Sequence, residues 1–226
     1  EVAQESSRIG ASFFTHYPLK PRYPQPNPKP TRKDWQRAGW LTPDGKVAAK
    51  LFVGHYVGDY DAPSWLYKAV AAHFADPTRG QVPLAWAFNP NLADRAPQAL
   101  AYAYRHASTN DWFIAGDSGA GYLNPRALTV RPDSKRPAGL AAWEAYCRQY
   151  YRRWDMTITG FILDGAAGAS TDLEFAAYAR FAPHGAGTHF EPGPAIHAGL
   201  PTCPDRDLPA DARAAARFIA ARAAER

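Results

Sequence analysis

The sequence lacks the features of several large classes of protein. No stretch of the 226 residues approaches the roughly 18 consecutive apolar residues of a membrane-spanning helix, so we predict no membrane span. Only two cysteines are present, Cys147 and Cys203, which excludes a disulfide-dense scaffold and a four-cysteine zinc site. The two could form one bridge in a secreted protein, but we expect Cys147 to be a buried thiol on a helix.

The first residues also lack two common features of a chain start. They contain neither an initiator methionine nor a basic-then-apolar leader pattern. We therefore expect the chain to be a processed or excised piece of a longer protein.

Proline and aromatic residues are abundant. The chain has 21 Pro, 7 Trp, 12 Tyr and 11 Phe, and the aromatic residues make up 13% of it. This composition suits long ordered loops and flat apolar surfaces for a ring-shaped ligand. The net charge is +5, but the Lys and Arg residues are dispersed along the chain, so we predict no nucleic-acid partner.

Prolines recur at close intervals between residues 18 and 30, a spacing that excludes a helix and a central strand. We predict an extended segment there, either a wrapping arm or an inter-domain linker. The predicted division is a Pro-rich arm or linker at 1–45 and a barrel-like domain at 46–226.

Beyond residue 45 the sequence alternates between predicted strands and helices. Four apolar runs have the length of buried strands, namely Val47–Val53, Val82–Phe88, Trp112–Ala115 and Thr157–Leu163. A helical pattern follows each run, with apolar stripes at Leu66/Val70/Phe74, Leu100/Tyr104, Leu140/Trp143/Cys147/Tyr150/Trp154 and, after a capping box at Thr171–Glu174, Leu173/Ala177/Phe181. A last Ala-rich helix is predicted from about Pro209 to the end.

Successive strand–helix units predict an α/β fold with a mostly parallel sheet. A complete eightfold barrel typically takes about 250 residues, and the segment at 183–206 is a Gly/Pro-rich stretch without a clear unit. We therefore predict a barrel-like (β/α) repeat that forms an incomplete or irregular TIM-type barrel.

Polar side chains gather where the predicted strands end, which is where parallel-sheet proteins bind ligands. His55, Asp59 and Asp61 follow the first strand, Asn89 and Asn91 the second, Asp117, Tyr122 and Asn124 the third, and Asp164 the fourth. Hydroxyl-rich ligands need such planar polar groups for paired hydrogen bonds and aromatic rings against their C–H faces. We predict substrate-binding roles for His55, Asp61, Trp86, Asn89, Asn91, Tyr122 and Asn124.

Cleavage of a glycosidic bond needs two carboxyl groups. Asp117 and Asp164 end consecutive strands and are the predicted catalytic pair, with Asp59 or Asp61 as the third candidate. Asp59 and Asp61 could instead cap the helix near Pro63, and Asp164 could be a turn residue before Gly165.

Three other motifs fit less well. His73 and Ser118 resemble segments of trypsin-like proteases, but they are too close in sequence and lie in strand–helix units. His189 and Glu191 resemble part of a zinc deaminase signature whose Pro-Cys-x-x-Cys is missing. His184, His189 and His197 match no metal-ligand spacing, so we predict no metal and no cofactor.

The segment Gly119-Ala120-Gly121-Tyr122-Leu123-Asn124-Pro125 resembles the name-giving motif of the GxGYxYP family of putative glycoside hydrolases. The match covers Gly, Gly, Tyr and Pro, and departs at Asn124, where the motif has Tyr. The segment 82–92 is also similar to that family's C-terminal domain, and the resemblance extends over roughly residues 45–185.

The resemblance implies a barrel-like C-terminal domain of a secreted or periplasmic bacterial protein that also has an N-terminal domain. It implies action on carbohydrate but supplies no catalytic pair. We therefore predict a glycoside hydrolase acting on a poly- or oligosaccharide through strand-end carboxylates. The alternative is a non-catalytic carbohydrate-binding or accessory domain.

Overall fold

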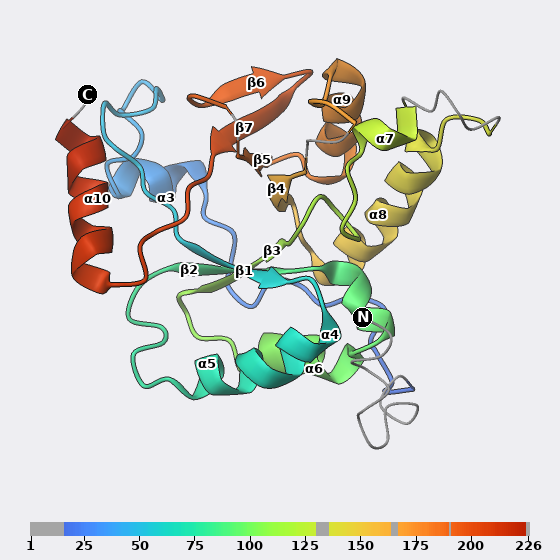
Figure 1. Cartoon of the computed structure of the whole chain (residues 1–226). Helices are drawn as coiled ribbons and strands as arrows, with labels where there is room; N and C mark the ends of the chain where they lie inside the picture. Colours follow the sequence, from blue (N-terminus) through green and yellow to red (C-terminus); the bar gives the residue numbers. More distant parts are fainter. Residues whose placement is uncertain (1–15, 130–135, 164–166, 190, 225–226) are drawn as a thin grey trace. The chain divides into compact units, whose positions relative to one another are not determined.

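Seven strands in the described part of the chain form one mostly parallel sheet, which curls into a half-barrel (Figure 1). The computed structural model describes residues 16–129, 136–163, 167–189 and 191–224. The strand order is β1-β2-β3-β4-β5-β7-β6, and β6 alone among these strands runs antiparallel to its neighbour. The predicted incomplete barrel-like α/β fold is thus confirmed.

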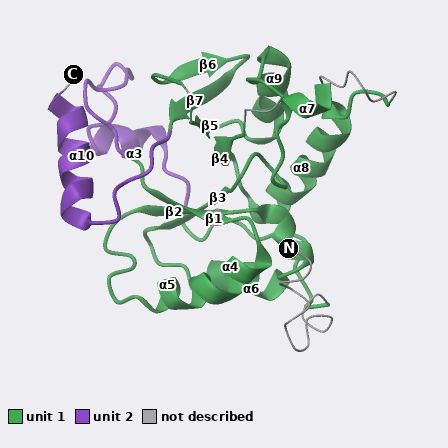
Figure 2. Ribbon diagram, in the orientation of Figure 1, with its two compact units in different colours: residues 1–27, 54–204 green, residues 28–53, 205–226 purple. Residues whose placement is uncertain are grey.

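The chain divides into two compact units (Figure 2). Unit 1 comprises residues 1–27 and 54–204, and unit 2 comprises residues 28–53 and 205–226. This division differs from the boundary expected between residues 45 and 46.

Unit 1 contains the whole sheet and most of the helices. Its elements are β1 (Tyr56–Tyr60), α4 (Pro63–Trp65), η1 (Leu66–Val70), α5 (Ala71–Ala75), β2 (Leu84–Phe88), η2 (Pro90–Asp94), α6 (Pro97–Arg105), β3 (Asp111–Ala115), α7 (Arg126–Thr129), α8 (Leu140–Trp154), β4 (Ile158–Ile162), α9 (Asp172–Phe181), β5 (Gly185–Thr188), β6 (Ala195–His197) and β7 (Leu200–Pro204). Within the described ranges, no helix has the length and apolarity needed to cross a membrane.

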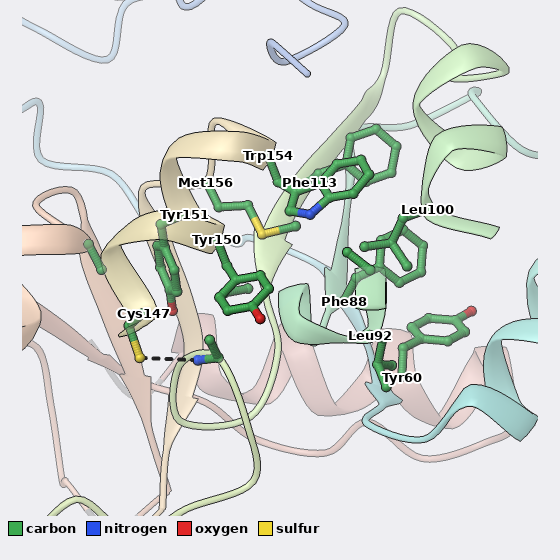
Figure 3. Packing of buried hydrophobic residues seen from close by; sticks show 14 of the residues in the cluster. Tyr60, Phe88, Leu92, Leu100, Phe113, Cys147, Tyr150, Tyr151, Trp154 and Met156 are labelled. Atoms are coloured by element: carbon green, nitrogen blue, oxygen red, sulfur yellow. Dashed lines mark hydrogen bonds between the residues drawn. The ribbon is translucent and has the colours of Figure 1, made fainter. Parts of the chain in front are cut away.

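Large apolar side chains on one face of the sheet pack against the helices (Figure 3). Phe88 of β2 and Phe113 of β3 are both buried, with ring centroids 5.7 Å apart. Phe113 stacks on Tyr104 of α6 at 4.1 Å, and Tyr104 lies 5.1 Å from Trp154 of α8. Burial of each such side chain is worth about 1.5–3 kcal/mol, so this layer holds the helices on the sheet.

The helical stripes of the sequence are largely confirmed. Leu66, Val70 and Phe74 are buried, as are the predicted residues of α8 from Trp143 onward. The capping box at Thr171 is present at the start of α9. Leu173 is the exception, since 63% of it is exposed, and α9 buries Phe175 and Tyr178 in addition to the expected Ala177 and Phe181.

The first strand lies later in the sequence than predicted. Val47–Val53 is not a strand but belongs to unit 2, where Val47 forms an isolated bridge with Leu41. The strand is Tyr56–Tyr60, which carries Gly58 and Asp59 and pairs with β2 with a register shift. The apolar run misled the prediction because nearly all of its residues are exposed, and among the described side chains of β1 only Tyr60 is fully buried.

The Gly/Pro-rich stretch at 183–206 contains three strands that the sequence pattern did not reveal. β5 consists of Gly185, Ala186, Gly187 and Thr188 and pairs with both β4 and β7. A Cβ atom on Gly187 would lie 1.9 Å from the carbonyl oxygen of Gly160. The close approach of these strands requires glycine, which removes the apolar signal of an ordinary buried strand.

Residues 16–27 form the wrapping arm of unit 1. Tyr23 stacks on Trp154 with centroids 4.4 Å apart, and its backbone N–H donates to Arg153 O. Gln25 Nε2 donates to Phe113 O at 2.8 Å, and Phe113 N donates to Gln25 Oε1 at 3.0 Å. The Gln25 amide thus pairs with β3 as the backbone of a strand would.

Unit 2 has several exposed apolar side chains, among them Trp40 and Phe52. It holds α3 (Arg32–Arg37), which Thr31 and Asp34 cap, and α10 (Ala212–Ala224), close to the predicted last helix. Neither helix has a buried residue among those described. Trp40 and Phe52 meet edge to face at 6.3 Å.

Candidate functional site

The parallel strands place several of the predicted residues along one edge of the sheet, which we call the carboxyl edge. Asp61 follows β1, Asn89 and Asn91 follow β2, and Asp117 follows β3. β2 and β3 pair in perfect register over five residues, from Leu84–Asp111 to Phe88–Ala115. The loops after β2 and β3 therefore start at the same level of the sheet.

Asp117 lies at the centre of this edge and is 3% exposed. It comes two residues after β3, between Gly116 and Ser118. Gly116 N donates to Phe88 O at 2.8 Å, and Ser118 N donates to Phe161 O of β4 at 2.8 Å. The backbone on both sides of Asp117 is thus attached to a neighbouring strand.

The loop after Asp117 has an unusual backbone. Ser118 has a φ of +54° and Gly119 a φ of +120°. A Cβ atom at Gly119 would lie 3.0 Å from both Cys147 Sγ and Trp143, so glycine is required by conformation and by packing.

The same loop is anchored to α8. Ala120 N donates to Cys147 Sγ at 3.3 Å (Figure 3). Cys147 and Cys203 are not joined by a disulfide, and burial raises the pKa of Cys147 to about 12. The expectation of a buried Cys147 on a helix is confirmed, and its role here is to hold the loop.

Asn89 and Asn91 bring the loop after β2 to the loop after β3. Asn89 is 2% exposed, and its Oδ1 finds no hydrogen-bond donor among the residues that the structure describes. Asn91 Nδ2 lies 3.4 Å from where a Cβ atom of Gly121 would be. A buried amide oxygen without a donor is costly, so Asn89 Oδ1 offers an acceptor for a ligand or a water.

Tyr122 and Asn124 lie in the second half of the segment Gly119–Pro125. Tyr122 is 63% exposed, so its ring is open to solvent. Asn124 Oδ1 accepts a hydrogen bond from Arg126 N at 2.9 Å at the start of α7, while its buried Nδ2 has no partner in the described part of the chain.

Two predicted residues, His55 and Trp86, lie away from this group. His55 precedes β1, and its carbonyl oxygen accepts from Ala85 N near the start of β2, so it lies at the opposite, amino edge of the sheet. Its predicted place in the loop after the first strand was wrong because that strand begins at Tyr56. Trp86 is buried in the core, and its indole N–H donates to Asp111 Oδ1 at 2.8 Å.

The remaining predicted carboxylates are placed as follows. Asp59 is a residue of β1 rather than of the loop after it, and Asp61 is half-buried directly beyond the strand. Asp164 lies outside the described residues. Its neighbour Leu163 is described and follows β4 at the carboxyl edge.

Two buried carboxylates on other elements serve the fold. Asp111 at the start of β3 forms an ion pair with Arg79. Glu174 accepts hydrogen bonds from Thr171 N at 2.7 Å and from the Thr129 hydroxyl. Burial raises the pKa of Glu174, but these hydrogen bonds outweigh it and hold the pKa below its usual value.

A further polar cluster lies on β5 to β7 and was not predicted. Glu191 Oε2 accepts from Thr202 Oγ1 at 2.7 Å and Thr188 Oγ1 at 3.0 Å, and Glu191 Oε1 lies 2.6 Å from His197 Nε2. His197 stacks on Phe175 of α9 at 4.5 Å. Thr202 is directly opposite Ala195 in the hairpin, and the stacking of His197 on Phe175 joins the hairpin to α9. The sequence showed only a His and a Glu in a Gly/Pro-rich loop.

The fold and this edge define the class of protein: a half-barrel of parallel strands with acidic and amide side chains where the strands end. The model of the GxGYxYP putative glycoside hydrolase C-terminal domain matches residues 49–190, and the chain belongs to this family. The segment Gly119–Pro125 in the loop after β3, which resembles the motif in the family's name, lies within the matched residues.

A solved structure shares the fold. It is a protein from Bacteroides thetaiotaomicron VPI-5482 described as a putative hydrolase, with 23% identity and a TM-score of 0.56. The similarity covers 74% of this chain and 33% of that one, so the chain spans about a third of the length of its solved neighbour. No significant match exists among curated proteins.

Proposed function

We propose that the chain is a glycoside hydrolase that acts on a poly- or oligosaccharide, with Asp117 as one of its two reacting carboxyl groups. The position of Asp117 supports this most strongly. It is a buried carboxyl group at the carboxyl edge, beside a strained loop that resembles the family motif. Strained backbone held by its surroundings is concentrated at functional sites.

Hydrolysis of a glycosidic bond adds water across it and needs one carboxyl group to protonate the leaving oxygen and a second to act as base or nucleophile. In this proposal the second group is Asp164, which follows the strand next to β3, with Asp59 or Asp61 in reserve. A separation of about 5–5.5 Å between the two carboxyl groups would give retention, and one of about 6.5–9.5 Å would give inversion.

The other residues of the edge would hold the sugar. The Asn89 amide oxygen needs a donor, and a sugar hydroxyl supplies one. Asn91 lies against the Gly121 backbone, and the exposed ring of Tyr122 offers a face for the C–H groups of a pyranose.

We also propose a secreted or periplasmic bacterial setting with a separate N-terminal domain. The family description as a C-terminal domain and the greater length of the solved neighbour support the additional domain. Polysaccharides too large to enter a cell must be cut outside it.

The intact protein, incubated with a panel of polysaccharides and aryl glycosides, tests the proposed activity. We expect reducing ends or aryl alcohol to be released from at least one substrate class. Binding on a glycan array without release from any substrate would favour the non-catalytic alternative, for which the exposed Tyr122 ring is the supporting observation. If the protein neither releases product from any substrate nor binds any glycan, both proposals are contradicted.

A further inference from the structure

The contact between β3 and β4 is the least regular in the parallel part of the sheet. β3 pairs with β2 at five registered positions, but with β4 only at Ala115–Thr159. Beyond Ala115 the chain passes through Gly116 and Asp117, and the link to β4 resumes at Ser118.

Ser118 restores the parallel pairing by means of its side chain. Its N–H donates to Phe161 O at 2.8 Å, and its Oγ accepts from Leu163 N at 2.6 Å. A residue paired with Ile162 in a parallel ladder would make the same two bonds with its own N–H and C=O. The register is the one set by Ala115–Thr159, so the hydroxyl takes the place of the Ser118 carbonyl.

The carbonyl is released from the ladder because Ser118 adopts a left-handed backbone, with a φ of +54°. It accepts instead from the Tyr178 hydroxyl of α9 at 2.9 Å. Burial raises the pKa of Tyr178, so its hydroxyl stays protonated and remains a donor. Ser118 is fully buried and is held by β4 on one side and by α9 on the other.

We propose that Ser118 is a positioning residue of this site, which sets where the Asp117 carboxyl group lies relative to the carboxyl end of β4. The proposal rests on the proposed hydrolase function and on the role of Asp117 in it. Asp117 directly precedes Ser118, and the Leu163 amide, which Ser118 Oγ binds, is the last described group of the chain as it leaves β4. One hydroxyl therefore joins the two strand ends on which the reacting groups are proposed to lie.

Two substitutions separate this role from ordinary stabilisation. Ser118→Ala removes the acceptor and keeps a side chain in a strained backbone conformation. Ser118→Gly also removes the acceptor, but glycine accepts a positive φ without strain. We expect the glycine variant to have a melting temperature closer to that of the wild type than the alanine variant has.

Ser118→Gly should regain stability without regaining activity. On a glycan that the wild type hydrolyses, we expect both variants to lose about 100-fold in kcat with little change in KM, the effect of a misplaced reacting group. Ser170→Ala is the control, because the buried Ser170 Oγ has no hydrogen-bond partner among the described residues. Recovery of kcat together with stability in Ser118→Gly would overturn the proposal.

Hydrogen exchange keeps the inference testable if no substrate is found. The Leu163 amide should exchange about tenfold faster in both Ser118 variants than in the wild type or Ser170→Ala, because it loses its acceptor. Absence of wild-type turnover would contradict the proposed hydrolase and not the link between the strands. Unchanged exchange at Leu163 would contradict the link itself.

Discussion

The two sides of β3 are built differently. Toward β2 the backbone pairs at five successive positions, and the rings of Phe88 and Phe113 pack over the pairing. Toward β4 the backbone pairs at one position, and side chains supply further hydrogen bonds. The Gln25 amide binds the backbone of β3 at the amino end, and the Ser118 hydroxyl binds the Leu163 amide after β4 at the carboxyl end. The irregular side is the one where Asp117 leaves the sheet, so the fold gives up backbone regularity where the proposed site begins.

The largest loss of stability should come from a substitution at the regular contact between β2 and β3. Phe88→Ala leaves a cavity beside Phe113 and Tyr60, whose rings lie 5.7 and 4.9 Å from that of Phe88. We expect a loss of about 3–5 kcal/mol in the free energy of unfolding, measured by chemical denaturation. Leu173→Ala, at an exposed position, should change it by less than about 0.5 kcal/mol. A loss below about 1 kcal/mol for Phe88→Ala would contradict a core centred on this contact.

A substitution at the amino end of the β4 side of β3, where Gln25 binds, should cost less stability. Gln25→Ala removes both partners of the Phe113 backbone and a donor to Asp155 O. We expect a loss of about 1–3 kcal/mol in the free energy of unfolding, the cost of unsatisfied polar groups. The control is Gln149→Ala on the exposed side of α8. Equal stability of the two variants would show that the arm does not support β3.

A substitution at Glu174 tests the stability of α9, the helix whose Tyr178 binds the Ser118 carbonyl. The pKa of Glu174 is lower in the folded state than in the unfolded state, so its contribution to stability is present near neutral pH and is lost as the pH falls below about 4.5. Glu174→Gln should lower the free energy of unfolding by roughly 1 kcal/mol at pH 7 and should flatten its decline in acid. Denaturation curves across pH 3–7 measure both effects. Identical pH dependence in the wild type and the variant would refute this account of Glu174.

The last prediction concerns a difference in reactivity between the two thiols and involves no substitution. Cys203 is exposed, whereas Cys147 is buried beneath the loop at Ala120 with a pKa raised to about 12. At pH 8 a thiol reagent should label Cys203 in the folded protein and Cys147 only after denaturant is added. Mass spectrometry of labelled peptides identifies the sites. Rapid labelling of Cys147 without denaturant would mean that the loop after β3 opens readily.

The sequence predicted those parts of the fold that depend on a repeating apolar pattern. The stripe from Trp143 to Trp154, the strands ending at Phe88 and Ala115, and the cap at Thr171 are all where they were expected. In these elements, local preference and burial in the core favour the same structure.

The other elements depend on contacts that no local pattern encodes. β5 needs glycine for close approach, and β1 has one fully buried residue among its described side chains, so neither carries a continuous apolar run. The structure brings Asn89, Asn91 and Asp117 together as the strand-end rule suggested, but it places His55 at the other edge because the start of β1 was misjudged. The role of Ser118 depends on a backbone angle and on Tyr178, and neither can be inferred from sequence spacing.

The central claim, that Asp117 is a reacting group, is tested most directly by the turnover of Asp117→Asn. The side chain keeps its size and loses its ability to act as an acid, a base or a nucleophile. On a glycan that the wild type cleaves, we expect kcat to fall by at least about 100-fold while the melting temperature and glycan binding persist. Asp172→Asn, at an exposed position on α9, should retain wild-type turnover. Turnover of a folded Asp117→Asn variant at the wild-type rate would contradict the claim.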